Sequence, residues 1–185
     1  MTIELWEVIS SRRNASYGIF NFRTDRARSP RTGREYDCYI LESTPWVNVI
    51  PLTPQKEVVL IRQYRHGIRN LTLEIPGGLV ERQDTPETAA KRELCEETGY
   101  QASEMISLGN LLPNPAIQNN RCYTFLAKDV FVAGKQQLDE MEDIEVLSRP
   151  LAEIPHLIRE GKISHSLVVA AFFKYYLEYE GGSFR

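Results

Sequence analysis

The sequence contains little cysteine. Its three cysteines, Cys38, Cys95 and Cys122, lie far apart, and none belongs to a Cys-x-x-Cys pair. An odd number of widely separated cysteines argues against a disulfide framework or a zinc site. We therefore expect small buried thiols in a reducing compartment, which indicates a cytoplasmic protein.

Long apolar runs and a surplus of basic residues are also absent. The longest apolar run, Leu167 to Phe173, is far shorter than the roughly 20 residues that a membrane-spanning helix needs. Residues Met1 to Glu7 have neither a basic start nor an apolar signal core. A formal net charge of -3 argues against a general nucleic-acid-binding surface. We therefore expect neither a membrane nor a nucleic acid as partner.

The composition that is present, 42% hydrophobic and 25% charged, is ordinary for a globular protein. The chain length suits one domain with a hydrophobic core and a small appendage. We predict an N-terminal β appendage over residues 1–43, with strands at 3–10, 17–23 and 36–41 separated by polar turns. A sheet this small buries little surface alone, so it should pack on the main body or on a second subunit.

Residues 44–185 interleave strands and helices without strict alternation. This order predicts an α/β fold in which helices flank a mixed sheet. The expected strands are 47–52, 58–64, 71–75, 106–111, 122–131 and 144–148, and the expected helices are 86–98, 151–160 and 164–179.

The helix expected over residues 86–98 places carboxylates on its only apolar face. At about 100° per residue, Glu93 and Glu97 fall inside the arc formed by Ala89, Ala90 and Leu94. Turning two carboxylates toward the protein body is costly unless something neutralises them. A divalent cation does so, and magnesium prefers oxygen ligands of this kind. The alternative interpretation is a solvated acidic face.

Two glycines before this helix favour the metal-site interpretation. Gly77 and Gly78 allow the backbone to come close to an ion or a phosphate. As an isolated signal, the same pair would indicate only a turn. Together with the helix, the glycines predict one site for cations and phosphate.

The glycines and charged residues follow a fixed spacing, Gly78-x5-Asp84-x7-Arg92-Glu93-Leu94-x-Glu96-Glu97-x-Gly99-Tyr100. This spacing resembles the Nudix box, in which the first acid is glutamate where this chain has Asp84. The chain is also similar to the ADP-ribose and nucleotide-sugar pyrophosphatase branch, because of Gln63-Tyr64-Arg65, Glu74-Ile75-Pro76-Gly77-Gly78 and the β-rich N-terminus. The resemblance implies an α/β/α sandwich, a magnesium- or manganese-dependent hydrolase, and a homodimer.

Roles for individual residues follow from the resemblance, position by position. It implies that Glu93 and Glu97 are metal ligands, and that Glu96 is a ligand or a close catalytic support. The Gly77 carbonyl would also meet metal. Arg92 would orient the carboxylates by a charge-assisted hydrogen bond.

The family branch also takes a base from an acidic loop, here Asp139–Asp143. The Glu-x-Glu spacing in this loop resembles the branch pattern. We assign Glu140 as the base that activates water and Glu142 as a further metal ligand. The alternative is a solvated charged loop.

Substrate contacts are expected outside the box. Arg65 is expected to meet phosphate and Glu74 a ribose hydroxyl, with a structural ion pair as the alternative for either residue. Tyr17 or Phe22 would stack on a base, with a role as core or strand residues as the alternative.

The loop over residues 112–121 departs from the branch pattern of Ser-Pro-Gly followed by Glu. Asn114 replaces the serine, Ala116 the glycine, and Asn120 stands where glutamate is usual. In relatives this loop reaches the distal part of the substrate, and amides suit sugar hydroxyls. We therefore expect Asn114 and Asn120 to contact the substrate, which would be a nucleoside diphosphate sugar other than ADP-ribose, or several such sugars.

The function expected from these features is magnesium-dependent hydrolysis of the diphosphate linkage of a nucleoside diphosphate sugar. ADP-ribose, ADP-glucose and GDP-mannose are the substrate types, and a nucleoside monophosphate and a sugar phosphate are the products. One alternative is a Nudix hydrolase of dinucleoside polyphosphates or oxidised nucleotides. The other is a non-catalytic nucleotide-sugar sensor, against which the retained Glu93, Glu96 and Glu97 argue.

Overall fold

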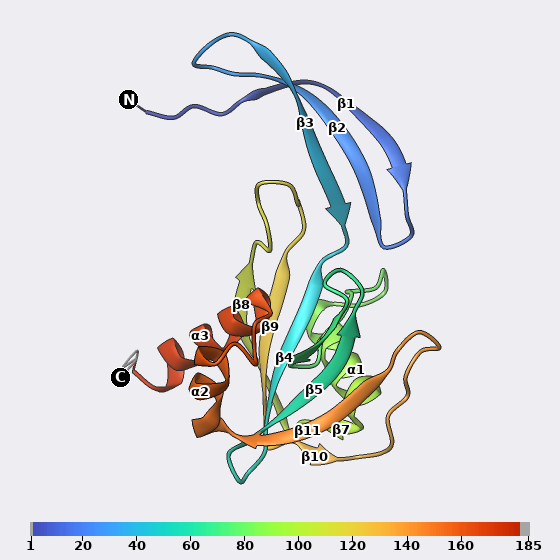
Figure 1. Cartoon of the computed structure of the whole chain (residues 1–185), viewed down its shortest axis with the longest axis vertical. Coiled ribbons are helices and arrows are strands. Elements are labelled where there is room, and N and C mark those ends of the chain that lie inside the picture. The colour runs from blue at the N-terminus through green and yellow to red at the C-terminus, as the bar shows by residue number, and fades with distance from the viewer. Residues whose placement is uncertain (1, 182–185) are drawn as a thin grey trace. The chain divides into compact units, whose positions relative to one another are not determined.

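The polar turns near the N-terminus separate three strands of an antiparallel sheet in the computed structural model, which describes residues 2–181 (Figure 1). The strands are β1 (Glu7–Ser16), β2 (Phe20–Arg28) and β3 (Glu35–Ser43), in the order β1-β2-β3. The expected first strand began at residue 3. In the structure β1 begins at Glu7 because Glu7 pairs with Arg28, the last residue of β2.

The strand β2 extends further into charged sequence than the predicted range of 17–23. Its second half carries alternating arginines that lie opposite acidic residues of β3. Arg26 pairs with Asp37 at 3.1 Å, and Arg28 pairs with Glu35 at 3.0 Å. Opposite charges on neighbouring strands stabilise their pairing. A sequence pattern based on apolar residues does not detect such pairs, so the predicted strand ended too early.

The chain divides into two units, and the division differs from the expected boundary at Ser43. The first unit contains the chain up to Thr44 together with Leu112–Arg121. The second contains Pro45–Leu111 and the chain from Cys122 onward. The loop 112–121, which we expected in the main domain, therefore belongs to the N-terminal unit. There Leu41 and Gln118 form an isolated β-bridge.

The second unit contains a six-stranded mixed sheet. Its order is β11-β5-β4-β9-β8, with β6 paired to β5, and only β4 and β9 run parallel among these pairs. The strands are β4 (Trp46–Leu52), β5 (Glu57–Arg65), β6 (Asn70–Glu74), β8 (Glu104–Leu111), β9 (Cys122–Lys128) and β11 (Ile144–Pro150).

The strand predicted over residues 122–131 is interrupted. β9 ends at Lys128, and Asp129 adopts a positive φ of 49°, which turns the chain out of the sheet. The following strand β10 (Phe131–Val132) pairs instead with β7 (Tyr100–Gln101) in a separate two-stranded sheet.

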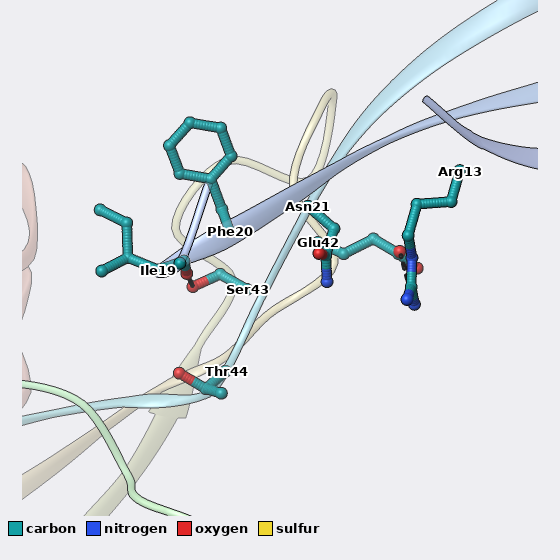
Figure 2. A pocket seen from close by; sticks show the side chains of 8 residues that line it. Arg13, Ile19, Phe20, Asn21, Glu42, Ser43 and Thr44 are labelled. Atoms are coloured by element: carbon teal, nitrogen blue, oxygen red, sulfur yellow. Dashed lines mark hydrogen bonds and ion pairs between the residues drawn. The ribbon is translucent and has the colours of Figure 1, made fainter. Parts of the chain in front are cut away.

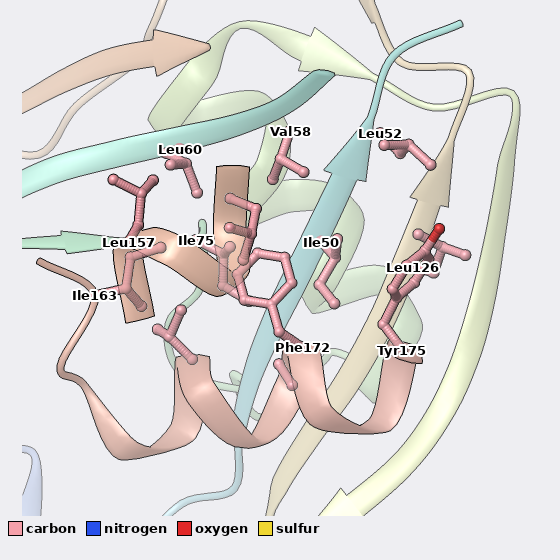
Figure 3. Packing of buried hydrophobic residues seen from close by; sticks show 13 residues of the cluster. Ile50, Leu52, Val58, Leu60, Ile75, Leu126, Leu157, Ile163, Phe172 and Tyr175 are labelled. Carbon is pink, nitrogen blue, oxygen red and sulfur yellow. The ribbon is translucent and has the colours of Figure 1, made fainter. Parts of the chain in front are cut away.

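Helices cover both faces of the six-stranded sheet, which confirms the expected α/β/α arrangement. The helix α1 (Pro86–Thr98) packs on one face through Ala89, Ala90 and Leu94. The opposite face carries α2 (Ile154–Arg159), preceded by a 3-10 turn, and α3 (Ser166–Tyr179). Figure 3 shows Phe172 of α3 pointing toward Ile50 and Val58 of the sheet.

Alternation along the central strands explains how the sheet supports two cores. Val47 and Val49 of β4 face α1, whereas Ile50 and Leu52 pack in the cluster with α3. Burial on both faces favours such continuous apolar strands. Among the helices of residues 2–181, none combines the length and apolar character required to span a membrane.

Candidate active site

The helix α1 is fixed at both ends by local signals. Thr85 is the N-cap, and Thr85 and Thr88 form a reciprocal capping box with Pro86 in the first turn. Gly99 ends the helix in the left-handed conformation, with φ 75°. The carboxylate of Asp84, the residue before the cap, accepts hydrogen bonds from Thr88 and from Arg92.

The carboxylates of Glu93 and Glu97 are buried against the Gly77–Gly78 turn. The Gly77 amide donates to Glu97 Oε2 at 2.8 Å. A Cβ atom on Gly78 would overlap the carboxylate of Glu93. Only glycine at position 78 leaves room for the Glu93 carboxylate. The turn and the helix thus hold the carboxylate oxygens of Glu93 and Glu97 in one place, which we call the cradle.

Burial raises the pKa of Glu93 to about 7, and the negative charges of Glu96 and Glu142 add to the effect against the opposing charge of Arg92. Burial also raises the pKa of Glu97 to about 8, where the Gly77 amide opposes the shift and the charges of Glu93 and Glu142 reinforce it. The protein therefore supplies less positive charge than these two carboxylates need to stay ionised at neutral pH.

Arg92 connects the acidic residues of this region. Its Nη1 donates to Glu93 at 3.0 Å and to Glu96 at 2.9 Å, and its Nε donates to Asp84 at 3.2 Å. Nη2 donates to the carbonyl of Leu79 at 3.0 Å, which ties the guanidinium to the turn before the helix. Arg92 thus links three acidic side chains to this turn, and its expected role in orienting them for metal stays a prediction.

Glu96 and the acidic loop lie at the edge of the cradle. The Glu96 side chain is 37% exposed and accepts from Arg92. Of the two loop glutamates, Glu142 is the one whose charge acts on Glu93 and Glu97. Glu140 is exposed. The structure therefore brings Glu142 toward the buried pair and leaves Glu140 in solvent.

Arg65 and Glu74 form a bidentate ion pair on the antiparallel strands β5 and β6. Arg65 Nε and Nη2 donate to the two carboxylate oxygens of Glu74 at 2.8 and 2.7 Å. Thr72 Oγ1 donates to Glu74 Oε1 at 2.6 Å. Burial raises the pKa of Glu74, but the hydrogen bonds from Arg65 and Thr72 outweigh it and hold the pKa below its usual range. The charge of Arg65 also acts on Glu97.

The donor set of the cradle suits a hard divalent cation. Among the side chains of residues 2–181, no three of the types His, Cys, Asp and Glu are gathered closely enough to enclose a metal ion. Glu93 and Glu97 nevertheless offer buried oxygens whose charge the protein does not neutralise, and the charge of Glu142 acts on both. Oxygen-only ligands of high charge are those that Mg²⁺ and Mn²⁺ prefer. The residues present therefore fit such an ion.

The two aromatic residues expected to stack on a base lie in the N-terminal unit. Tyr17 is exposed in the turn between β1 and β2, with its ring centroid 5.4 Å from that of Phe20. Phe22 stacks on Tyr39, with ring centroids 5.9 Å apart and an interplanar angle of 13°. Phe22 therefore already has an intramolecular stacking partner, whereas Tyr17 presents its ring to solvent.

A pocket of about 280 Å³ lies in this same unit, and sequence reasoning missed it (Figure 2). Neither Tyr17 nor Phe22 lines it, but the intervening Phe20 does. The polar residues that line the pocket come together only when β2 pairs with β1 and β3. The only local sequence signal for the pocket was therefore the aromatic residue Phe20. The lining residues are Arg13, Gly18, Ile19, Phe20, Asn21, Glu42, Ser43 and Thr44.

The two asparagines of the 112–121 loop have different surroundings. Asn114 is exposed, and its carbonyl accepts from the amides of Ile117 and Gln118, which closes a turn. Asn120 is buried, and its Nδ2 donates to the carbonyl of Thr44 at 3.4 Å. Among the described residues, Asn120 Oδ1 has no hydrogen-bond partner. A contact between either side chain and substrate stays a prediction.

Comparison with known proteins places these residues in a wider context. A family model described as the NUDIX domain matches residues 43–172. The chain is 30% identical to the ADP-ribose pyrophosphatase of Bacillus subtilis over 118 residues, which cover 63% of this chain and 64% of that protein. It is 29% identical to the ADP-ribose pyrophosphatase of Mycobacterium tuberculosis over 170 residues, which cover 89% of this chain and 80% of that protein.

The solved structures include a similar fold. A crystal structure of an ADP compounds hydrolase superposes with a TM-score of 0.85 at 21% sequence identity. The match covers 99% of this chain and 98% of that chain. At this level of identity the match shows that the two chains share a fold.

Proposed function

This chain belongs to the Nudix domain family, and from that premise we propose that it is a metal-dependent pyrophosphohydrolase acting on nucleoside diphosphate sugars. The reaction breaks the diphosphate linkage and yields a nucleoside monophosphate and a sugar phosphate. The observation that carries this proposal is the buried pair Glu93 and Glu97, held against Gly77–Gly78 with raised pKa values.

Glu93, Glu97 and the Gly77 carbonyl are the groups that would hold the metal, with Glu142 as a further ligand from the loop. When bound there, Mg²⁺ or Mn²⁺ would supply positive charge that offsets the charge of the diphosphate and favours deprotonation of the attacking water. Arg92 keeps Glu93 oriented toward the cradle through its hydrogen bonds. The buried position of Glu97 excludes bulk water from that side.

We assign Glu140 as the base that accepts the proton of the attacking water, with Glu96 in a supporting catalytic role. Glu140 lies in the same loop, two residues from Glu142, whose charge acts on the buried pair. We propose that Glu140 reaches the attacking water when substrate is bound. A carboxylate within reach of the attacking water can act as a general base.

The substrate class is supported by the relatives named ADP-ribose pyrophosphatase and by Arg65. Arg65 uses Nε and Nη2 to bind Glu74, so the half-exposed edge bearing Nη1 is the part that can reach a phosphate. Glu74 Oε1 already accepts from Arg65 and Thr72, whereas Oε2 accepts from Arg65 alone, and a carboxylate oxygen can accept more than one hydrogen bond. A ribose hydroxyl can therefore still donate to Glu74.

The N-terminal sheet supports a homodimer in which this unit contacts the base of the substrate. Large apolar side chains that a monomer would leave in water are exposed on it, among them Trp6, Val8, Tyr36 and Tyr39. The aromatic residues Tyr17 and Phe22 and the amides Asn114 and Asn120 remain our proposed substrate contacts in this unit. The three free cysteines support a reducing compartment, the cytoplasm.

A hydrolysis screen tests this proposal. ADP-ribose, ADP-glucose, GDP-mannose and UDP-glucose are incubated with the protein with and without Mg²⁺, and the release of monophosphate is measured. We expect cleavage of at least one of them in the presence of metal. Cleavage of diadenosine polyphosphates or oxidised nucleotides instead would show that the proposed substrate class is wrong. Binding without cleavage would indicate a sensor.

A further inference from the structure

The segment that follows β10 is fastened to the C-terminal end of α1. The carbonyl of Gly99 accepts from the amides of Ala133 at 2.9 Å and Gly134 at 3.1 Å. The amide of Gln137 donates to the carbonyl of Glu96 at 2.8 Å. The last carbonyls of a helix lack partners within the helix. This segment therefore completes the hydrogen bonding of the helix that carries the metal-binding carboxylates.

Gly99 makes the close approach of this segment possible. A Cβ atom at this position would lie 2.5 Å from the carbonyl oxygen of Gly134, nearer than atoms can pack. The positive φ of Gly99 also disfavours any residue with a side chain. One glycine of the box thus both ends the helix and admits the loop that follows β10.

The side chain of Gln136 joins the helix end to the sheet. Its Nε2 donates to the carbonyl of Glu97 at 2.7 Å and to the carbonyl of Ile144 at 3.1 Å. A carboxamide nitrogen has two hydrogens, so one amide group satisfies both acceptors. Ile144 is the first residue of β11, and the acidic loop Asp139–Asp143 lies between the two anchored points.

The tip of the acidic loop has only local support among these hydrogen bonds. The amide of Asp139 donates to Glu142 Oε2 at 3.1 Å, and the amide of Glu142 donates to the Asp139 carbonyl at 3.0 Å. Met141 at the tip is 90% exposed. The turn fixes the shape of the tip, while the distance between the tip and the helix depends on the anchors at its two ends.

We propose that Gln136 is a positioning residue that sets the distance between the acidic loop and the carboxylates of α1. Its amide spans the two ends of the loop, and its contacts are backbone carbonyls rather than reacting groups. The inference rests on the proposed function, because it takes a loop glutamate to be the base. A displacement of about 1 Å in a catalytic group can cost up to about a hundredfold in rate.

The variant Gln136→Glu tests the inference, and Gln137→Glu is its matched control. Glutamate has the shape of glutamine but would turn a second oxygen toward the carbonyls of Glu97 and Ile144, so the bridge is lost. The same charge at position 137 leaves the backbone hydrogen bond of that residue intact. We expect kcat to fall about tenfold in Gln136→Glu, with KM within about twofold, and little change in the control.

Amide hydrogen exchange over residues 138–143 supplies a readout that needs no substrate. Exchange should be faster in Gln136→Glu than in Gln137→Glu, and Gln136→Ala should behave in the same way without added charge. Equal exchange in the two glutamate variants would overturn the anchor. Faster exchange with an unchanged kcat would overturn the positioning role. If the wild-type protein cleaves no nucleoside diphosphate sugar, the proposed function fails, and the exchange rates still decide whether the anchor exists.

Discussion

Glu74 and Glu97 are equally buried, each 3% exposed, yet their pKa values shift in opposite directions. Burial raises the pKa of both carboxyls. At Glu74 the hydrogen bonds from Arg65 and Thr72 outweigh burial. At Glu97 the Gly77 amide opposes burial only in part, and the neighbouring carboxylates reinforce it.

The difference shows how the protein treats two buried acids near one site. Glu74 has a permanent cation in Arg65, whose guanidinium contacts both of its oxygens. Glu97 has other carboxylates as neighbours, and the Gly77 amide and the charge of Arg65 offset its burial only in part, so a cation from solution would stabilise its charge further. A buried acid with an internal cationic partner is stabilised in its charged form by the protein itself, whereas one without such a partner is suited to bind metal.

The largest expected effect comes from removing the charge of Glu97. Glu97→Gln keeps the size of the side chain but removes a proposed metal ligand, and we expect kcat to fall by about a thousandfold or more. The matched control is Glu87→Gln on the same helix, where the side chain is exposed and pairs with Lys91. Both variants should keep the wild-type circular dichroism spectrum. Turnover of Glu97→Gln near that of the control would remove Glu97 from the metal site.

Sequence alone sufficed for the parts of the site that local signals determine. The bounds of α1 follow from Thr85, Pro86 and Gly99, and the helical period placed Glu93 and Glu97 on the face that the structure buries. The end of β9 at Lys128 was missed because the positive φ of Asp129 has no marker such as glycine.

Non-local pairing could not be predicted in the same way. The contact of Arg65 with Glu74 requires the register of β5 on β6, and the placement of residues 112–121 with the N-terminal unit requires the position of Gln118 beside Leu41. Register depends on tertiary packing as well as on the local residue pattern. The sequence therefore named Arg65 and Glu74 as candidates but left open whether they bind each other or the substrate.

The pH dependence of metal-free stability separates the two kinds of buried acid. The folded pKa values of Glu93 and Glu97, about 7 and about 8, lie above the ordinary value for glutamate. A raised folded pKa contributes stability that is present at pH 4 and is lost as the pH rises through 7 and 8. We expect the free energy of unfolding in EDTA to fall by about 6 kcal/mol from pH 5 to pH 9.

Urea unfolding at a series of pH values measures this slope. The double variant Glu93→Gln and Glu97→Gln should show a much flatter profile, because neither glutamine titrates. Addition of Mg²⁺ should stabilise the wild-type protein more at pH 8 than at pH 5, since the cation binds the ionised carboxylates. A wild-type profile that rises from pH 5 to pH 9 in EDTA would contradict the raised pKa values.

A smaller effect is expected from filling the space beside Glu93. Gly78→Ala would place a methyl group where the Glu93 carboxylate lies, so the carboxylate must move. We expect kcat to fall up to about a hundredfold, with an increase in the Mg²⁺ concentration needed for half-maximal rate. Gly67→Ala is the control, because a methyl group there meets open space. An unchanged metal requirement in Gly78→Ala would show that Glu93 need not sit against the turn.

The smallest expected effect comes from removing the charge of Glu74. Glu74→Gln retains one carbonyl acceptor but removes the ionic partner of Arg65, and we expect the free energy of unfolding to fall by about 2 kcal/mol. Glu97→Gln should be neutral or stabilising in EDTA at pH 8, because it removes a buried charge that the protein does not neutralise. Urea unfolding of the two variants side by side measures both. If both lose stability equally, Glu97 has a protein partner as effective as Arg65, and the contrast with Glu74 disappears.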